Sequence, residues 1–212
     1  MAADVMSQSP RRPPSGERAA KKRAAIVRAA RQEFLNHGFN IGMDAIAAEA
    51  GVSKMTVYNH FAGKEELFAE VISDALDRAF EETLRMMESR RSEAEDLREL
   101  LVSTAHGWVD GIAQPDVLAL RALIAGEGRR FPELGRAWRE QGPERFSSIL
   151  SSTLREQEDL TIPDMDLAVT QFYALVLYPH IVRYAYGDRI DERMTEKLIN
   201  SGVDMFLGYY RS

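Results

Sequence analysis

Residues 42–64 constrain the fold of this chain most, because they form a pattern of two short helices joined by a tight turn. Small and apolar residues recur at the spacing of one helix face, at Met43, Ile46, Ala47 and Ala50. Gly51 then interrupts the pattern and suits the left-handed backbone that ends many helices. Ser53 is a favourable N-cap for the second helix. The spacing predicts a helix-turn-helix, whose second helix enters the major groove of DNA.

The second of these helices would bury a narrow stripe and expose a mixed polar face. Val57 and Phe61 lie four residues apart and form the buried stripe. The outward face would carry Lys54, Met55, Tyr58 and Asn59, with Thr56 and His60 at its flanks. Such side chains suit base edges and phosphates. The alternative is a solvated amphipathic helix, but a helix of about eight residues is unstable without packing, which favours DNA binding.

Residues 46–68, IAAEAGVSKMTVYNHFAGKEELF, closely resemble the DNA-binding domain of TetR/AcrR-type transcriptional regulators. The order IA, AGVS, Y-x-HF and KEELF carries the resemblance, and residues 30–39, ARQEFLNHGF, resemble the end of that family's first helix. The resemblance implies DNA base contacts from Lys54, Met55 and Tyr58. It implies DNA phosphate contacts from Ser53, Thr56, Asn59, His60 and Lys64.

Gly42 departs from the family pattern, which usually has Ser or Thr at this position. Glycine is an acceptable N-cap, but it has no side-chain hydroxyl for a phosphate. The sequence therefore leaves open whether the chain makes that one DNA contact.

Residues 120–150 resemble the C-terminal domain of an AefR-like subgroup of the same family, through the stretches EGRRFPELGRAW and GPERF. This resemblance implies a homodimer, a ligand cavity among the C-terminal helices and a dimer interface formed by the last two helices. The N-terminal and C-terminal resemblances together cover most of the chain.

Charge is distributed unevenly along the 212 residues, whose net charge is −6. Residues 1–64 hold ten Lys and Arg against five Asp and Glu, a net of +5. Residues 65–212 hold 17 against 28, a net of −11. A basic N-terminal part on an acidic body is expected of a DNA-binding regulator and disfavours a protein that binds anionic membranes.

Several classes of protein are disfavoured by what the sequence lacks. It has no cysteine, and its four histidines are scattered, so we expect neither a metal site nor a cofactor. The longest apolar run, residues 172–178, is too short to span a bilayer, and we expect a cytoplasmic protein. Common motifs of hydrolases, nucleotide-binding enzymes and zinc proteases are missing, and we expect no enzymatic activity.

The helical period continues through the rest of the chain, which predicts an all-α fold. We expect a disordered tail at 1–16, a DNA-binding domain at 17–63 and a ligand-binding and dimerisation domain at 64–212. Arg11 and Arg12 could form a minor-groove arm, although a solvated tail is the simpler interpretation. Helices are expected at about 17–37, 64–91, 94–113, 115–128, 132–141, 143–158, 164–186 and 191–210. Pro179 should kink the helix at 164–186.

The last two expected helices carry more apolar residues than one core-facing stripe needs, which predicts burial on two sides. We expect a dimer interface that includes Leu167, Leu175, Leu198, Val203, Phe206 and Tyr210. The alternative is an ordinary pair of core helices within one protomer.

A ligand pocket is expected where aromatic residues and isolated cations of the C-terminal helices converge. The candidates are His106, Trp108, Ile112, Leu120, Arg121, Ile124, Trp138, Phe146, Phe172, Tyr173 and Tyr178. Arg121 lies in an otherwise apolar helix and could bind the acid group of an amphiphilic or aromatic effector. It could equally form an intrachain salt bridge with Glu127 or Asp116.

Together these patterns predict a ligand-responsive repressor that binds a palindromic operator in double-stranded DNA as a homodimer and is released by an apolar or amphiphilic effector. Two hypotheses from other classes remain open. One is a helical protein that binds a small molecule but no longer binds DNA. The other is a helical enzyme that uses the cavity.

Overall fold

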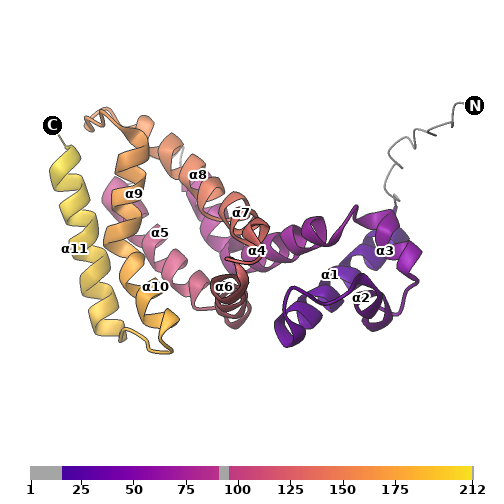
Figure 1. The fold of residues 1–212 in the computed structure, drawn as a ribbon. Helices are drawn as coiled ribbons and strands as arrows, with labels where there is room; N and C mark the ends of the chain where they lie inside the picture. Colours follow the sequence, from indigo (N-terminus) through magenta and orange to yellow (C-terminus); the bar gives the residue numbers. More distant parts are fainter. Residues whose placement is uncertain (1–15, 91–95, 212) are drawn as a thin grey trace, which may run out of the picture. The chain divides into compact units, whose positions relative to one another are not determined.

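The computed structural model describes residues 16–90 and 96–211, which form helices and their connections (Figure 1). The expected all-α fold is confirmed for these residues, whose one departure from helix and loop is an isolated bridge between Leu160 and Arg211. The chain divides into two compact units, with the boundary between Val71 and Ile72. The predicted disordered tail, including Arg11 and Arg12, lies outside the described residues apart from Gly16.

Among its described residues, from position 16 onward, the N-terminal unit contains three helices and the start of a fourth. These are α1 (Glu17–His37), α2 (Met43–Glu49), α3 (Lys54–His60) and α4 (Lys64–Arg90). Positive backbone φ angles at Gly38 (79°) and Gly51 (65°) end α1 and turn the chain between α2 and α3, as the sequence predicts. The core is a cluster of three aromatic rings, in which the Phe68 centroid lies 5.2 Å from both Phe34 and Phe39.

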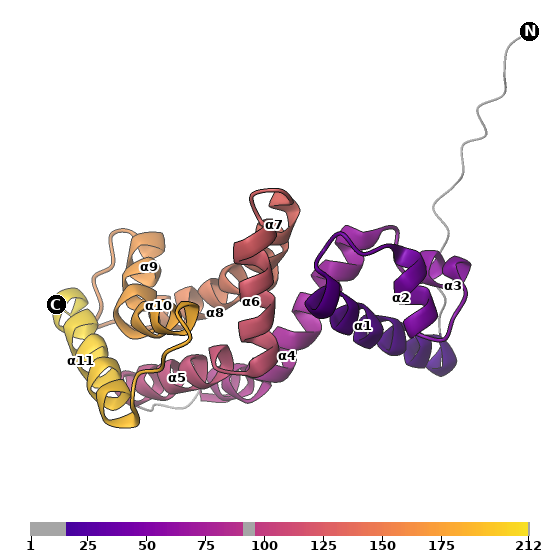
Figure 2. The same cartoon turned by 60° about the horizontal axis from the view of Figure 1, so that its bottom comes forward.

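The C-terminal unit contains the rest of α4 and seven further helices among its described residues. They are α5 (Leu97–Ile112), α6 (Pro115–Glu127), α7 (Pro132–Gln141), α8 (Pro143–Arg155), α9 (Met165–Val176), α10 (Tyr178–Ala185) and α11 (Glu192–Tyr210). A proline occupies the first turn of α6, α7 and α8, where its missing N–H has no helical partner to lose. In both ribbon views α11 lies beside α9, and it also contacts α5 (Figures 1 and 2).

The helix expected at 164–186 is two helices, α9 and α10, which meet at Leu177 with a bend of 53°. Pro179 explains the break, because it cannot donate a backbone hydrogen bond and its ring clashes with the preceding turn. The predicted kink is therefore confirmed. Among the described residues no single helix is long and apolar enough to cross a membrane, although α9 and α10 together reach that length and composition.

Helices α4 and α5 approach each other closely at two glycines of α5. A Cβ atom on Gly107 would lie 2.1 Å from the Thr83 hydroxyl, and one on Gly111 would lie 2.1 Å from the Phe80 ring. Only glycine allows this approach at either position. The Phe80 ring therefore packs directly against the α5 backbone.

Candidate nucleic-acid interface and ligand pocket

The recognition helix α3 begins as the sequence predicts. The Ser53 hydroxyl accepts a hydrogen bond from the Thr56 backbone N–H at 3.1 Å, which is the geometry of an N-cap. The Ser53 and Thr56 hydroxyls lie 2.9 Å apart and share a second hydrogen bond. Both hydroxyls keep unused hydrogen-bonding capacity, so the cap leaves them able to contact a phosphate.

The outward face of α3 carries the predicted side chains. Met55 is 61% exposed and Tyr58 is 45% exposed, although both have large apolar parts. Lys54 and Asn59 are exposed beside them, whereas Val57 is fully buried on the opposite side. Exposed apolar groups on a short surface helix suit a surface that another molecule covers.

His60, which was expected at a flank of the outward face, lies on the buried side of α3. Its side chain is only 8% exposed, because a position three residues after Val57 falls on the same buried side of the helix. Burial and the nearby charges of Arg23 and Lys22 lower the pKa of His60. A mostly buried imidazole supports the packing of α3, and the phosphate contact of His60 stays a prediction.

Lys64 makes contacts inside the N-terminal unit that the sequence did not predict. Its ammonium group donates to the Ile41 backbone carbonyl at 3.2 Å and lies 4.7 Å from the centroid of the Phe39 ring. These contacts join the start of α4 to the segment before α2. Because an ammonium group has three N–H donors, a phosphate contact is still available to it.

Lys54 is paired with an acidic residue of the neighbouring helix. Its ammonium nitrogen lies 2.9 Å from one carboxylate oxygen of Asp44 in α2. The hydrogen bond and the charge of Asp44 raise the pKa of Lys54. Both side chains are mostly exposed, so a polyanion such as DNA would compete directly with Asp44 for this lysine.

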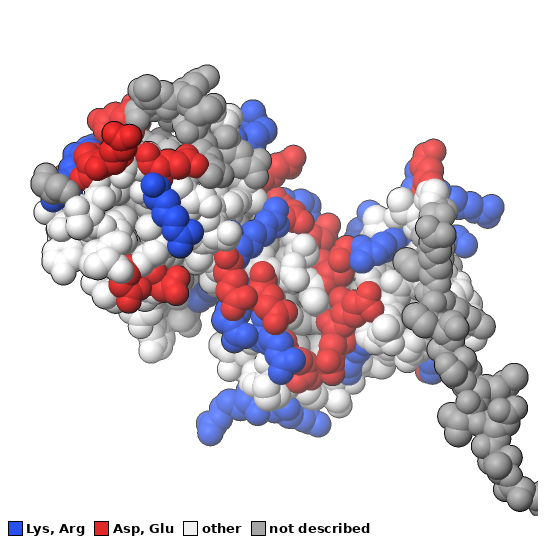
Figure 3. All heavy atoms as spheres, turned by 90° about the horizontal axis from the view of Figure 1, so that it is seen from above, with Lys and Arg blue, Asp and Glu red and all other residues white. Residues whose placement is uncertain are grey.

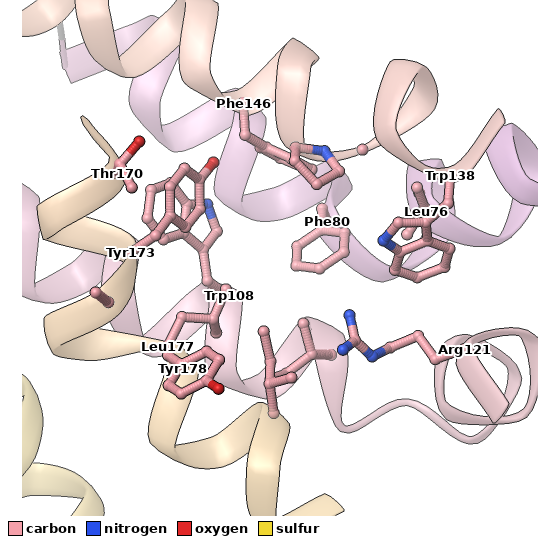
Figure 4. A pocket seen from close by; sticks show the side chains of 15 residues that line it. Leu76, Phe80, Trp108, Arg121, Trp138, Phe146, Thr170, Tyr173, Leu177 and Tyr178 are labelled. Carbon is pink, nitrogen blue, oxygen red and sulfur yellow. The ribbon is translucent and has the colours of Figure 1, made fainter. Parts of the chain in front are cut away.

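The C-terminal unit contains a partly open cavity of about 320 Å³, which α4 and the helices α5 to α10 line (Figure 4). Seven of the predicted pocket residues line it: Trp108, Ile112, Arg121, Trp138, Phe146, Tyr173 and Tyr178. Six of the fifteen residues that line it are aromatic. Trp108 and Tyr173 stack with their ring centroids 4.6 Å apart, and Phe80 meets Phe146 edge to face at 4.8 Å.

Four predicted residues do not line this cavity: His106, Leu120, Ile124 and Phe172. Leu120 and Phe172 are fully buried in the core instead, where the Phe172 ring packs between Trp108 and Phe206 at 5.7 and 5.1 Å. An aromatic or aliphatic residue on an apolar helix face fits a core as well as a pocket, and the sequence does not distinguish the two.

The cavity also has walls that the sequence analysis missed. They are Leu76 and Phe80 of α4, Gly142 and Pro143 between α7 and α8, and Thr170, Ala174, Leu177 and Ile181 along α9 and α10. The last four recur at intervals of three or four residues, which is the spacing of one helix face. That periodicity was the available signal for the α9–α10 wall.

Arg121 has no salt bridge among the described residues, whereas several surface arginines of the C-terminal unit, such as Arg98 and Arg139, form one. Acidic and basic side chains interleave on the face shown in Figure 3, and Asp116, one suggested partner of Arg121, pairs with Arg78 at 3.5 Å. The Arg121 guanidinium instead lies 5.4 Å from the Trp138 ring centroid. Burial lowers its pKa. The cavity therefore contains a half-buried cation that lacks a carboxylate.

The predicted dimer-interface residues differ in how exposed they are within the protomer, and the interface itself stays a prediction. Val203, Phe206 and Tyr210 of α11 are almost fully buried within the protomer. The outward apolar surface of α11 is instead Met205, 61% exposed, and Tyr209, 76% exposed. These two residues line a shallow groove, which we call the α9–α11 groove, together with Gln171, Ala174 and Leu175 of α9 and with Phe206 and Tyr210 of α11. Leu167 is exposed, and Leu175 and Leu198 are half-buried.

Comparison with known protein families shows which family the chain belongs to. The model of the tetR family of bacterial regulatory proteins matches residues 26–71. The model of the AefR-like transcriptional repressor C-terminal domain matches residues 99–212. The chain belongs to the TetR family. It is thus a helix-turn-helix transcriptional regulator with an AefR-like C-terminal domain, as the two resemblances in the sequence imply.

Individual relatives extend over nearly the whole chain. A TetR-family regulator from Mesorhizobium loti MAFF303099 is 29% identical with a TM-score of 0.76, covering 93% of this chain and all of that one. The flavonoid-responsive regulator FrrA is 31% identical with a TM-score of 0.74, covering 91% and 98%. A transcriptional repressor of Mycobacterium tuberculosis is 27% identical over 82% of this chain and 88% of its own length.

Two other curated regulators match over shorter stretches. The chain spans 26% of the length of one, which is named a transcriptional activator, and 21% of the length of the other.

Replacement of Asp44 by Asn is expected to strengthen DNA binding by this TetR-family chain a few-fold. The change frees Lys54 and removes a negative charge beside the recognition helix. Non-specific affinity should rise more than operator affinity, because the gain is electrostatic and independent of sequence. Binding isotherms on operator and random DNA at several salt concentrations measure both effects.

Glu49→Gln is the matched control for Asp44→Asn. Glu49 is an exposed acidic residue of the same helix that makes no ion pair among the described residues. Equal gains from the two variants would show that only net charge matters and that the pair with Lys54 has no specific effect.

Replacement of Gly111 by Ala is expected to disturb the pocket, because the new Cβ displaces the Phe80 ring. Overpacking of this kind costs roughly 1–3 kcal/mol, partly offset by the better helix propensity of alanine, about 1 kcal/mol. Ligand affinity should fall while DNA affinity is retained. Gly126→Ala is the control, since nothing lies within 4 Å of a Cβ there, and thermal melting with ligand titration compares the two.

Proposed function

We propose that this TetR-family chain is a dimeric repressor that leaves a palindromic operator when a planar aromatic effector fills the C-terminal cavity. The main support for this proposal is that helix α4 runs from the DNA-binding unit to the cavity. This single helix begins at Lys64, four residues after the recognition helix ends, and its later residues Leu76 and Phe80 line the cavity. A ligand in the cavity therefore contacts the same continuous helix that begins in the DNA-binding unit.

The coupling requires two positions of α4 that differ in their affinity for effector and operator. A ligand that binds one arrangement of the cavity better shifts the protein toward it. Movement of α4 would change the separation of the two recognition helices, and an operator with fixed half-site spacing then binds less well. By linkage, operator DNA weakens effector binding by the same factor.

We propose that base contacts come from Lys54, Met55 and Tyr58, because these side chains lie on the outward face of α3. Phosphate contacts are assigned to Ser53, Thr56, Asn59 and Lys64. The first two hydroxyls are already held in place by the N-cap of α3.

The proposed dimer forms through the α9–α11 groove. Met205 and Tyr209 leave an apolar surface there that no other described residue of the protomer covers. Pairing of this surface with its own copy about a two-fold axis would place two recognition helices on one palindrome. A regulator of this kind acts on DNA in the cytoplasm.

The effector class follows from the cavity walls. Its volume lies at the lower end of the range of about 300–1,000 Å³ typical of small-molecule sites. Stacked and edge-on aromatic rings favour a flat aromatic ligand, which can adopt the same geometries with them. FrrA, 31% identical to this chain, is named a flavonoid-responsive regulator, and a compound of that shape is a reasonable first ligand to test.

Selection of bound DNA from a random pool tests the proposal directly. We expect a palindromic sequence, and we expect a flat aromatic compound to release the protein from it at a concentration that also raises the melting temperature. Failure to enrich any sequence would favour a small-molecule-binding protein without DNA binding. Chemical conversion of the added compound would favour a cavity-based enzyme.

A further inference from the structure

The cavity of the C-terminal unit has a cationic end at Arg121. The guanidinium group is half-buried, and it makes no ion pair among the described residues. Its nearest aromatic neighbour, Trp138, offers a ring face at 5.4 Å. A partly desolvated cation is stabilised by an anion, and the planar fork of arginine matches a carboxylate with two parallel hydrogen bonds.

A second polar group lies at another wall of the same cavity. The Trp108 side chain is 1% exposed, and its Nε1–H has no hydrogen-bond partner among the described residues. Indole nitrogen is a donor only, so its missing partner must be an acceptor. Figure 4 shows this nitrogen and the Tyr173 hydroxyl on the side of the stacked Trp108–Tyr173 pair that faces Phe80.

Tyr173 makes this second end neutral. Burial raises the pKa of its hydroxyl, which lies near the Ser147 hydroxyl but makes no hydrogen bond among the described residues. Ser147 in turn donates to the Pro143 carbonyl at 2.7 Å. A protonated phenol next to the indole N–H can donate to or accept from a ligand oxygen, but neither group carries the charge that an anion would need as a partner.

The two ends and the walls between them define a ligand. Phe80 lies between the Trp108–Tyr173 pair and Arg121 in Figure 4, and the rings of Phe146 and Trp138 complete the aromatic wall. We propose that the effector is a planar aromatic acid, whose carboxylate binds Arg121 and whose other end presents a neutral hydroxyl or carbonyl oxygen to Trp108 Nε1. This inference rests on the proposed function and specifies the ligand of the same cavity.

Other ligand classes satisfy only part of the site. A fatty acid would pair with Arg121 but would leave the Trp108 N–H without an acceptor. A neutral flat aromatic molecule would satisfy Trp108 and the ring walls but would leave the arginine unpaired. A buried donor or charge without a partner disfavours the complex that contains it.

A matched set of four compounds tests the inference on the wild-type chain. The compounds are 4-hydroxycinnamate, its uncharged methyl ester, cinnamate, which lacks the hydroxyl, and decanoate, which lacks the ring. Calorimetric titration should give the highest affinity for 4-hydroxycinnamate, with each of the other three at least about tenfold weaker, the effect of one lost charged or buried hydrogen bond.

Two variants test which residue binds each end of the ligand. Arg121→Met keeps the volume of the side chain but removes its charge, so it should abolish the preference for acid over ester. Trp108→Phe keeps a ring in the stack but removes the N–H, so it should abolish the preference for 4-hydroxycinnamate over cinnamate. Each variant should keep the preference that the other loses, and this reciprocal pattern is the result that a merely destabilised protein would not give.

Several results would overturn the inference: equal binding of acid and ester by the wild-type chain, persistence of that preference in Arg121→Met, or no binding of either aromatic acid at millimolar concentration. Operator affinity measured without ligand separates this failure from that of the proposed function. DNA binding without acid binding removes the ligand assignment alone, whereas acid binding without DNA binding removes the regulator model.

Discussion

Replacement of Met205 by Glu should convert the dimer into a folded monomer. Met205 is 61% exposed at the α9–α11 groove, so the new carboxylate stays in water in the monomer but would be buried at a two-fold interface. Loss of a central interface residue costs roughly 2 kcal/mol or more, and each dimer carries the change twice. Sedimentation equilibrium should show the monomer at concentrations where the wild type is dimeric.

The adjacent residue is the matched control for Met205→Glu. Phe206 is 2% exposed and packs on Phe172 and Tyr210 inside the protomer. Phe206→Glu should therefore unfold the chain, since truncation of a buried phenylalanine alone costs about 3–5 kcal/mol and a buried charge adds to this. A monomeric wild type at micromolar concentration, or a Met205→Glu variant that stays dimeric, would contradict the interface assignment.

Replacement of Tyr58 by Ala should change which sequence the protein prefers. Tyr58 lies on the outward face of α3 and is 45% exposed, so truncation removes no core packing. Loss of a base contact should cost about 1–3 kcal/mol and relax specificity at one operator position. Affinities for a set of single-base operator variants, measured for wild type and Tyr58→Ala, reveal that position.

Lys64→Met is the contrasting variant, because a phosphate contact carries no sequence information. It should weaken all sites about equally and reduce the salt slope by about one. Methionine keeps apolar contact with Phe39 but loses the hydrogen bond to Ile41, so the melting temperature must be measured alongside. An unchanged salt slope in a folded Lys64→Met protein would show that this lysine serves the fold and not DNA.

Local sequence determined the helix-turn-helix by itself. Gly51 supplies the left-handed turn, Ser53 caps α3 and Val57 marks its buried side. Each of these features depends on neighbours within a few residues, through backbone sterics, an N-cap hydrogen bond or helical period. For the same reason the break at Pro179 could be predicted from one residue.

Only the tertiary structure decided which apolar or charged group meets which partner. Helical period shows that α11 has two apolar faces, but it does not reveal that Phe206 packs inside the protomer while Met205 faces outward. Arg121 lacks a salt bridge and Lys54 has one because of residues on other helices. Such contacts depend on how separate helices pack, and a one-dimensional pattern contains the period of each helix but not the position of its neighbours.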